Sequence, residues 1–198
     1  MFYGNLMKTV YVATGNLNKA KSIIMELKPY GITAKHVYVD IPEPRSYDIR
    51  EIATAKALFA YRETGKPCIV LDSGFFIGSL NGFPRTFVHY ALDVLGINNI
   101  LKLAKGNDRR CEFRECLAYY DGKKGKPKLF ESTLTGILAE RPMGRAEPFH
   151  WSELFQIFIP TGSDKTLAQM KKKEYLEWTS ETHKGSYMNK FAEWYMRK

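Results

Sequence analysis

The sequence has few cysteines, no long hydrophobic run and no excess of acidic residues. Its three cysteines, Cys68, Cys111 and Cys116, are an odd number without metal-ligand spacing, so we expect buried free thiols rather than disulfides or a zinc site. The longest apolar stretches fall far short of the roughly 20 residues that a transmembrane helix needs. The first eight residues do not fit a secretory signal. We therefore expect a cytoplasmic protein with no membrane partner.

The composition is that of a folded chain with a basic surface. Hydrophobic residues make up 44% of the 198 residues, which excludes disorder over most of the chain and predicts a single domain over residues 1–198. The 30 Lys+Arg outnumber the 21 Asp+Glu, so the net charge is 30 − 21 = +9. Such a charge suits a nucleic-acid surface or a pocket for a small polyanion such as a triphosphate. Because no nucleic-acid recognition motif is present, we rank nucleic acid last.

The hydrophobic pattern predicts strands and helices in alternation, followed by an antiparallel extension. The pattern also places turns after the first strand, at 14–16, and after the strand that ends at Leu71, at 72–74. The sum is an α/β fold with two lobes and a cleft between them. The expected strands are 9–13, 32–39, 67–71, 110–120, 128–138 and 153–160, and the expected helices are 18–28, 47–63 and 184–197.

A candidate phosphate-binding turn follows the first strand. Thr14, Gly15 and Asn16 lead into a helix that carries Lys19 in its first turn. The N–H groups at a helix N-terminus carry partial positive charge and favour phosphate. A simple capped turn with an exposed lysine explains the same residues equally well, and the pattern is not a Walker loop.

Two acids occupy positions where a metal could bind. Glu43 lies between two prolines that hold the backbone extended, and Asp72 follows a buried strand. Ligands bind at the ends of strands in open α/β sheets, and two carboxylates with substrate phosphates suit Mg²⁺. Taken separately, a solvated Glu43 and a turn-capping Asp72 are the simpler interpretations.

Together these segments resemble the inosine triphosphate pyrophosphatase family. The resemblance implies an elongated fold with a central mixed β-sheet flanked by helices, a nucleotide cleft between two lobes, and a homodimer. It also implies Mg²⁺-dependent hydrolysis of aberrant purine nucleoside triphosphates (ITP, dITP, XTP) to the monophosphate and pyrophosphate. The segments that carry it, in order, are 14–19 (TGNLNK), 41–43 (IPE), 72–76 (DSGFF), 80–84 (LNGFP), 96–103, 158–166 and 182–184 (THK).

The resemblance also assigns roles to residues. Asp72 becomes the general base and, with Glu43, a metal ligand, while Lys19 neutralises the triphosphate. The other residues that it places at the substrate are Thr14, Gly15, Asn16, Ser73, Gly74, Trp151, His183 and Lys184.

The sequence departs from the family pattern at several positions, among them Arg85, where the family has a glycine, and Val88, where it has a small hydroxyl residue. The family has an acid where this chain has Leu71, an aspartate in the base-recognition stretch near Ser152, and an arginine at Lys184. Lysine cannot form the bidentate fork of arginine. These changes leave an alternative open, in which the chain is a diverged nucleotide-binding member with weak or altered activity.

Overall fold

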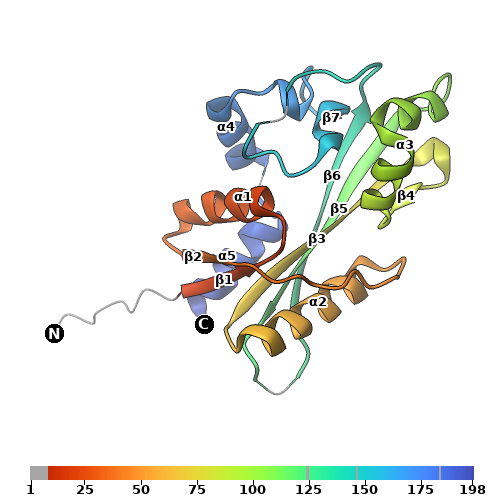
Figure 1. Cartoon of the computed structure of the whole chain (residues 1–198). Coiled ribbons are helices and arrows are strands. Elements are labelled where there is room, and N and C mark those ends of the chain that lie inside the picture. The colour runs from red at the N-terminus through yellow and green to blue at the C-terminus, as the bar shows by residue number, and fades with distance from the viewer. Residues whose placement is uncertain (1–8, 124, 146, 183) are drawn as a thin grey trace.

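A mixed seven-stranded sheet runs through the whole molecule (Figure 1). The computed structural model describes residues 9–198 except 124, 146 and 183. The strand order is β2-β1-β3-β5-β6-β7, and β4 pairs with β3. The strands are β1 (Thr9–Ala13), β2 (Thr33–Val37), β3 (Cys68–Ile77), β4 (Pro84–Arg85), β5 (Arg110–Tyr120), β6 (Lys128–Leu138) and β7 (Phe158–Pro160).

Parallel and antiparallel pairs meet at β3. β1 is parallel to β2 and to β3, whereas β5 runs antiparallel to β3 over ten residue pairs and β6 and β7 continue in antiparallel fashion. The long strands β3, β5 and β6 connect the two halves of the molecule seen in Figure 1. This arrangement confirms the predicted α/β fold with a central mixed sheet.

Helices pack on the sheet, and the buried residues between helices and sheet form three hydrophobic clusters. α2 packs on one face against Val70, Cys116 and Ala118. α1 and α5 cover the opposite face of the same half, and α3 and α4 cover the other half (Figure 1). The helices are α1 (Leu17–Leu27), α2 (Ile49–Thr64), α3 (Val88–Leu103), α4 (Lys172–Thr182) and α5 (Tyr187–Arg197), and short 3₁₀ helices span Lys28–Tyr30, Gly78–Leu80, Glu153–Gln156 and Leu167–Gln169.

Three predictions about these elements need correction. β3 does not end before Asp72 but continues to Ile77, because the apolar residues after Gly74 keep pairing with β5. The expected strand over 153–160 is a 3₁₀ helix followed by the short β7. The helices α3 and α4 and the short strand β4 had no counterpart among the expected elements.

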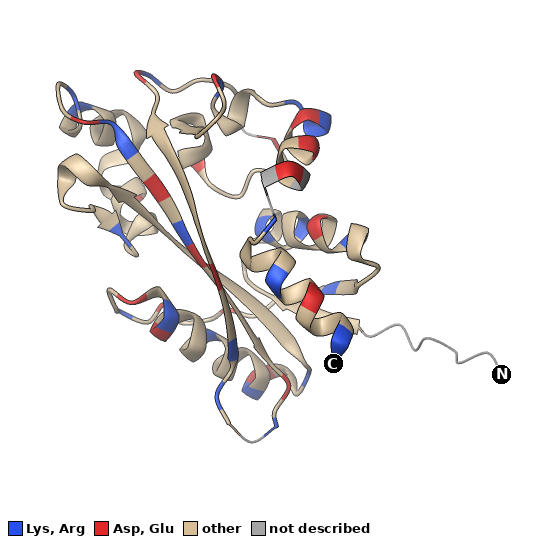
Figure 2. Cartoon of the chain, turned by 180° about the vertical axis from the view of Figure 1, so that it is seen from behind, with Lys and Arg blue, Asp and Glu red and all other residues tan. Residues whose placement is uncertain are grey.

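The predicted free cysteines are confirmed, since all three are buried and free. Burial raises the pKa of each thiol to about 12, which keeps the thiols protonated and unreactive at neutral pH. No helix in the described part of the chain is long and apolar enough to cross a membrane. Basic side chains are spread over many elements and interspersed with acidic ones (Figure 2), which is the pattern of a solvated surface.

Candidate functional site

The candidate site lies at an interruption of the sheet along one edge of β3. β5 pairs with β3 along its whole length, so β1 and β4 share the other edge. β1 pairs there with Cys68 and Ile69, and β4 pairs with Phe75 and Phe76. Among the described residues, the stretch 70–74 between them has no strand partner on that edge. Backbone and side-chain groups of Asp72 and its neighbours are therefore available for other contacts.

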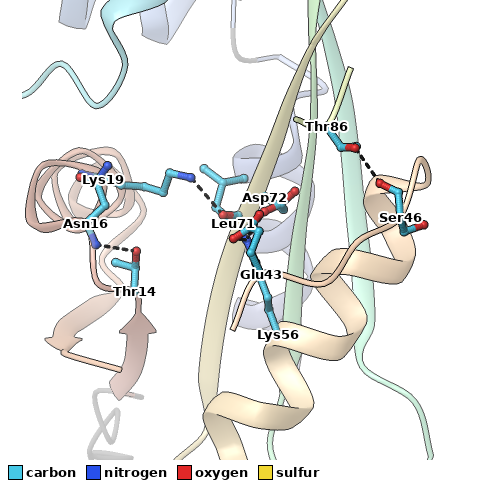
Figure 3. A network of polar contacts seen from close by, with 9 residues as sticks. All are labelled: Thr14, Asn16, Lys19, Glu43, Ser46, Lys56, Leu71, Asp72 and Thr86. Carbon is cyan, nitrogen blue, oxygen red and sulfur yellow. Dashed lines mark hydrogen bonds and ion pairs between the residues drawn. The ribbon is translucent and has the colours of Figure 1, made fainter. Parts of the chain in front are cut away.

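The N-terminus of α1 points at this interruption. Asn16 caps the helix, because its Oδ1 accepts a hydrogen bond from the Lys19 N–H at 2.9 Å, and its own N–H donates to Thr14 Oγ1 at 3.0 Å. The Lys19 ammonium donates to the free carbonyl of Leu71 at 3.3 Å (Figure 3). Burial lowers the pKa of Lys19, and the charge of Asp72 opposes this shift. The turn and its lysine thus adjoin Asp72.

Glu43 and Asp72 converge on one cation, Lys56 of α2. The Lys56 Nζ lies 2.8 Å from Glu43 Oε2 and 2.5 Å from Asp72 Oδ1 (Figure 3). Burial works against the charge of Lys56, but Asp72 and Glu43 outweigh it and raise the lysine pKa. Asp72 is itself only 4% exposed, so the ion pair between Lys56 and Asp72 is largely shielded from water.

Sequence reasoning missed Lys56, although a signal was present. Lys56 lies on the same helical face as Ile52, Ala53 and Ala60, all buried. A lysine on the buried face of an amphipathic helix needs a carboxylate partner. Its position therefore pointed toward an acid on the neighbouring strand.

The loops around the pair are tied to each other. Thr86, which follows β4, donates from Oγ1 to the carbonyl of Ser46 at 2.6 Å (Figure 3). Ser46 belongs to the segment between Glu43 and α2. The segment that carries Glu43 is thus held beside the end of the interruption.

Leu71 does not point toward the acids. Neighbouring residues of a strand face opposite sides, and Leu71 is buried in the cluster with Leu117 and Tyr187, whereas Asp72 faces α2. A carboxylate at this position would enter the core rather than the group formed by Glu43 and Asp72. Leu71 contributes its carbonyl oxygen to the site.

Ser73 carries a buried hydroxyl group, whereas Gly74 allows a close approach of the backbone. The Ser73 Oγ is buried and has no hydrogen-bond partner among the described residues. A Cβ at Gly74 would lie 2.8 Å from the Phe76 ring and 3.0 Å from the Arg85 carbonyl oxygen. The close approach of β4 therefore explains this glycine.

Trp151 lies beside Lys19, on a loop as predicted. The Lys19 Nζ is 5.1 Å from the centre of the Trp151 ring, and Asn16 Nδ2 donates to the Trp151 carbonyl at 3.4 Å. Ser152 Oγ accepts from the Leu154 N–H and starts a 3₁₀ helix. Lys184 is exposed, and His183 lies outside the described residues.

A cavity of about 910 Å³ lies elsewhere. It is lined in part by β5, along which basic and acidic residues alternate (Figure 2). None of the predicted site residues lines it. Its principal charged and aromatic lining residues are Tyr47, Phe76, Arg85, Asp108, Arg110, Glu112 and Arg114.

Comparison with known proteins identifies the family. The profile of the Ham1 family matches residues 10–194. The chain therefore belongs to the Ham1 family. It is 37% identical over 190 residues to a dITP/XTP pyrophosphatase of Methanopyrus kandleri, covering 96% of each chain. A dITP/XTP pyrophosphatase of Thermococcus kodakarensis is 30% identical over 189 residues, covering 95% of this chain and 97% of the relative.

A solved structure supports the fold of this Ham1 member independently. The HAM1 protein from Coxiella burnetii superposes with a TM-score of 0.73 at 21% identity, covering 96% of this chain and all of that one. At this identity the likeness concerns the fold alone. The match to the Ham1 family over residues 10–194 confirms the inference from short ordered motifs to this family.

Proposed function

We propose that this Ham1 protein hydrolyses non-standard purine nucleoside triphosphates, such as ITP, dITP and XTP, to the monophosphate and pyrophosphate. The observation that carries the proposal is the convergence on one interrupted strand edge of a helix N-terminus with Lys19 and of the carboxylates Glu43 and Asp72. Anion-binding groups lie on one side of β3 and proton-accepting groups on the other. Phosphoryl transfer from a nucleotide needs both.

The chain's own groups divide the work of the reaction. Thr14, Gly15 and Asn16 present the α1 N-terminus to the triphosphate, and Lys19 neutralises its charge. Asp72 accepts a proton from a water molecule whose oxygen forms a bond to the α-phosphorus. The bond from the α-phosphorus to the bridging oxygen breaks, and pyrophosphate leaves with that electron pair. Lys56 holds Asp72 and Glu43 in place.

Glu43 and Asp72 fit a divalent cation. Both carboxylates already converge on one positive charge, the Lys56 ammonium. Mg²⁺ commonly takes one or two carboxylates together with substrate phosphates and water, so the absence of a larger acidic cluster among the described residues is compatible with it. We propose these two residues as its ligands. When bound with the substrate, Mg²⁺ would offset the charge of the phosphates.

The base pocket would be built around Trp151. Trp151 stands next to Lys19, at a place where its ring can stack on a base whose phosphates reach the lysine. We propose that His183 and Lys184 contribute to base recognition. The changes at Ser152 and Lys184 favour the alternative of a diverged nucleotide-binding member whose activity is weak or has an altered base preference.

Pyrophosphate release tests the function. Purified protein is incubated with Mg²⁺ and each of ITP, dITP, XTP, GTP, ATP and CTP, and pyrophosphate is measured against time. We expect release that is fastest with the non-standard purines. Tight binding of these nucleotides without release would favour the diverged binding protein, and neither binding nor release would contradict both.

Asp72→Asn is the matched inactive variant. The amide is nearly isosteric but neither accepts the proton of water nor carries the charge that attracts a cation, so we expect turnover to fall to background. Circular dichroism checks that the fold is retained. Wild-type turnover in this variant would remove Asp72 from the mechanism.

We further propose that the chain acts as a homodimer in the cytoplasm, where its nucleotide substrates are found. The homodimer follows from the family resemblance. Light scattering coupled to size-exclusion chromatography measures the mass in solution. A mass of about 23 kDa, that of the 22.8 kDa chain alone, would contradict the dimer.

A further inference from the structure

A polar rung crosses the central strands between two hydrophobic clusters. Glu115 of β5 lies directly opposite Ser73 of β3 and Ser132 of β6, and we call these three residues the polar rung. Residues opposite each other share a face of the sheet, so all three face the side covered by α1 and α5. The neighbouring rungs on this face are apolar and belong to the two clusters: Leu71, Leu117 and Phe130 on one side, and Phe75, Phe113 and Leu134 on the other.

Glu115 is an uncompensated carboxyl in this rung. Among the described residues it has no hydrogen bond or ion pair, and it is only partly exposed. Burial and then the nearby charge of Glu26 raise the pKa of Glu115 to about 8, and Lys19 opposes the shift. An acid in such a place costs folding free energy, which local packing does not recover. Residues that break the packing rules in this way concentrate at functional sites.

The polar rung adjoins the two ends of the proposed nucleotide site. Phe113 is the next residue of β5 on the same face, and its ring centre is 5.9 Å from that of Trp151. The Lys19 Nζ lies 5.1 Å from the Trp151 ring and is close enough to Glu115 for each charge to affect the other's pKa. Glu115 therefore lies within the reach of a molecule that contacts both Lys19 and Trp151.

The acceptor oxygens of Glu115 select the part of the nucleotide that it can contact. Beside the triphosphate an ionised Glu115 would add repulsion between like charges, whereas an N–H of the base can donate a hydrogen bond to it and, like Lys19, favours the ionised form. A 6-oxopurine carries such a donor at N1, but adenine presents a lone pair there. At the position where the resemblance expects an aspartate this chain has Ser152, and the adjacent Glu153 is exposed in a 3₁₀ helix, so Glu115 is the acid that faces this side of the sheet.

We propose that Glu115 is a specificity-determining residue, which accepts a hydrogen bond from the N1–H of a 6-oxopurine base and disfavours adenine. This inference rests on the proposed function for the placement of the nucleotide. The inference goes beyond the proposed function because it names the group that distinguishes the bases.

Base preference and phosphate affinity are measured separately to test this. Glu115→Ala and Glu115→Gln are compared with Glu112→Ala, a control on the same strand whose side chain faces away and pairs with Arg114 at 2.6 Å. The ratio of kcat/KM for ITP to that for ATP reports on the base. The inhibition constant of inorganic tripolyphosphate reports on the phosphate site alone.

We expect Glu115→Ala to lower the ITP-to-ATP ratio by roughly tenfold to a hundredfold, as the loss of a hydrogen bond to a buried polar group does. Tripolyphosphate inhibition should not change. Glu115→Gln, which keeps a carbonyl acceptor, should retain part of the preference, and Glu112→Ala should retain all of it.

Two outcomes would overturn the inference. An unchanged ratio in Glu115→Ala would show that the carboxyl does not contact the base. Equal losses for ITP, ATP and tripolyphosphate would show that Glu115 positions Lys19 instead. Thermal unfolding checks that each variant is folded. If Glu115→Ala does not fold, the ITP-to-ATP ratio of Glu115→Gln tests the inference in its place. If the wild type releases no pyrophosphate, the proposed function fails, and the dissociation constants of ITP and ATP from calorimetry then give the same ratio.

Discussion

Replacing Glu26 by Gln should make the stability of this protein less sensitive to pH. Glu26 lies in α1, 9% exposed, and accepts a hydrogen bond from Ser22 Oγ at 2.8 Å. Burial raises the pKa of Glu26 from 4.5 to about 7. Between these values the folded protein keeps a proton that the unfolded chain has released. The free energy of unfolding of the wild type must therefore fall as the pH rises from about 5 to 8.

The size of the effect follows from the two pKa values of Glu26. They differ by 7 − 4.5 = 2.5, which at about 1.4 kcal/mol per pKa unit amounts to about 3.5 kcal/mol in full, of which the range from pH 5 to 8 covers the larger part. Gln keeps an acceptor for Ser22 but does not ionise, so the variant should lose this part of the decline. Glu115, whose pKa burial raises to about 8, should leave a decline of its own that is at least as large.

Urea unfolding at pH 5, 6, 7 and 8 measures these free energies. The control is Glu63→Gln, because the Glu63 side chain is 47% exposed and lies at the surface beside Arg62. We expect the wild type and the control to lose stability in parallel, and Glu26→Gln to lose about 2 to 3 kcal/mol less over this range. A variant whose decline matches that of the wild type would refute the reasoning that this carboxyl is buried in its neutral form.

Three further substitutions test the arrangement around β3. Lys19→Ala should raise KM for every triphosphate by a similar factor, because a cation at the phosphates carries no information about the base; base-dependent damage in steady-state kinetics would contradict that role. Lys56→Met should abolish turnover and destabilise the fold by roughly 3 to 5 kcal/mol in urea unfolding, since it leaves Asp72 buried without its partner; retention of both would show that the ion pair is dispensable. Leu71→Glu should lower the melting temperature without any gain in Mg²⁺-dependent activity, because its side chain enters the core; an activated variant would show that Leu71 can turn toward the acids.

Local patterns in the sequence predicted most of the strands. The runs at 9–13, 110–120 and 128–138 match β1, β5 and β6 residue for residue, since β-branched and aromatic residues alternate there and polar turns bound them. β3 was cut short because Ser73 and Gly74 look like a turn. What keeps them extended is the pairing with β5, about forty residues away in the chain, which no local pattern contains.

Local patterns likewise indicated one part of the candidate site and not the rest. The turn from Thr14 to Lys19 was found because a helix cap is a local feature. The contact of Lys56 with Glu43 and Asp72 was not, because the partners are 13 and 16 residues away and meet only when α2 packs on the sheet. Glu115 was missed for the same reason, since its surroundings come from α1, α4 and α5 as well as from its own strand.

The interruption along β3 links the fold to the proposed chemistry. A strand edge without a partner exposes backbone groups that must be satisfied, and Lys19 satisfies the carbonyl of Leu71. An ammonium has three donors, so Lys19 can keep this bond and still donate to a phosphate. The contact that completes the sheet edge therefore also fixes the cation where a triphosphate would need it. A β1 longer by a few residues would pair with this edge of β3 and displace Lys19. We infer that the site requires the short β1.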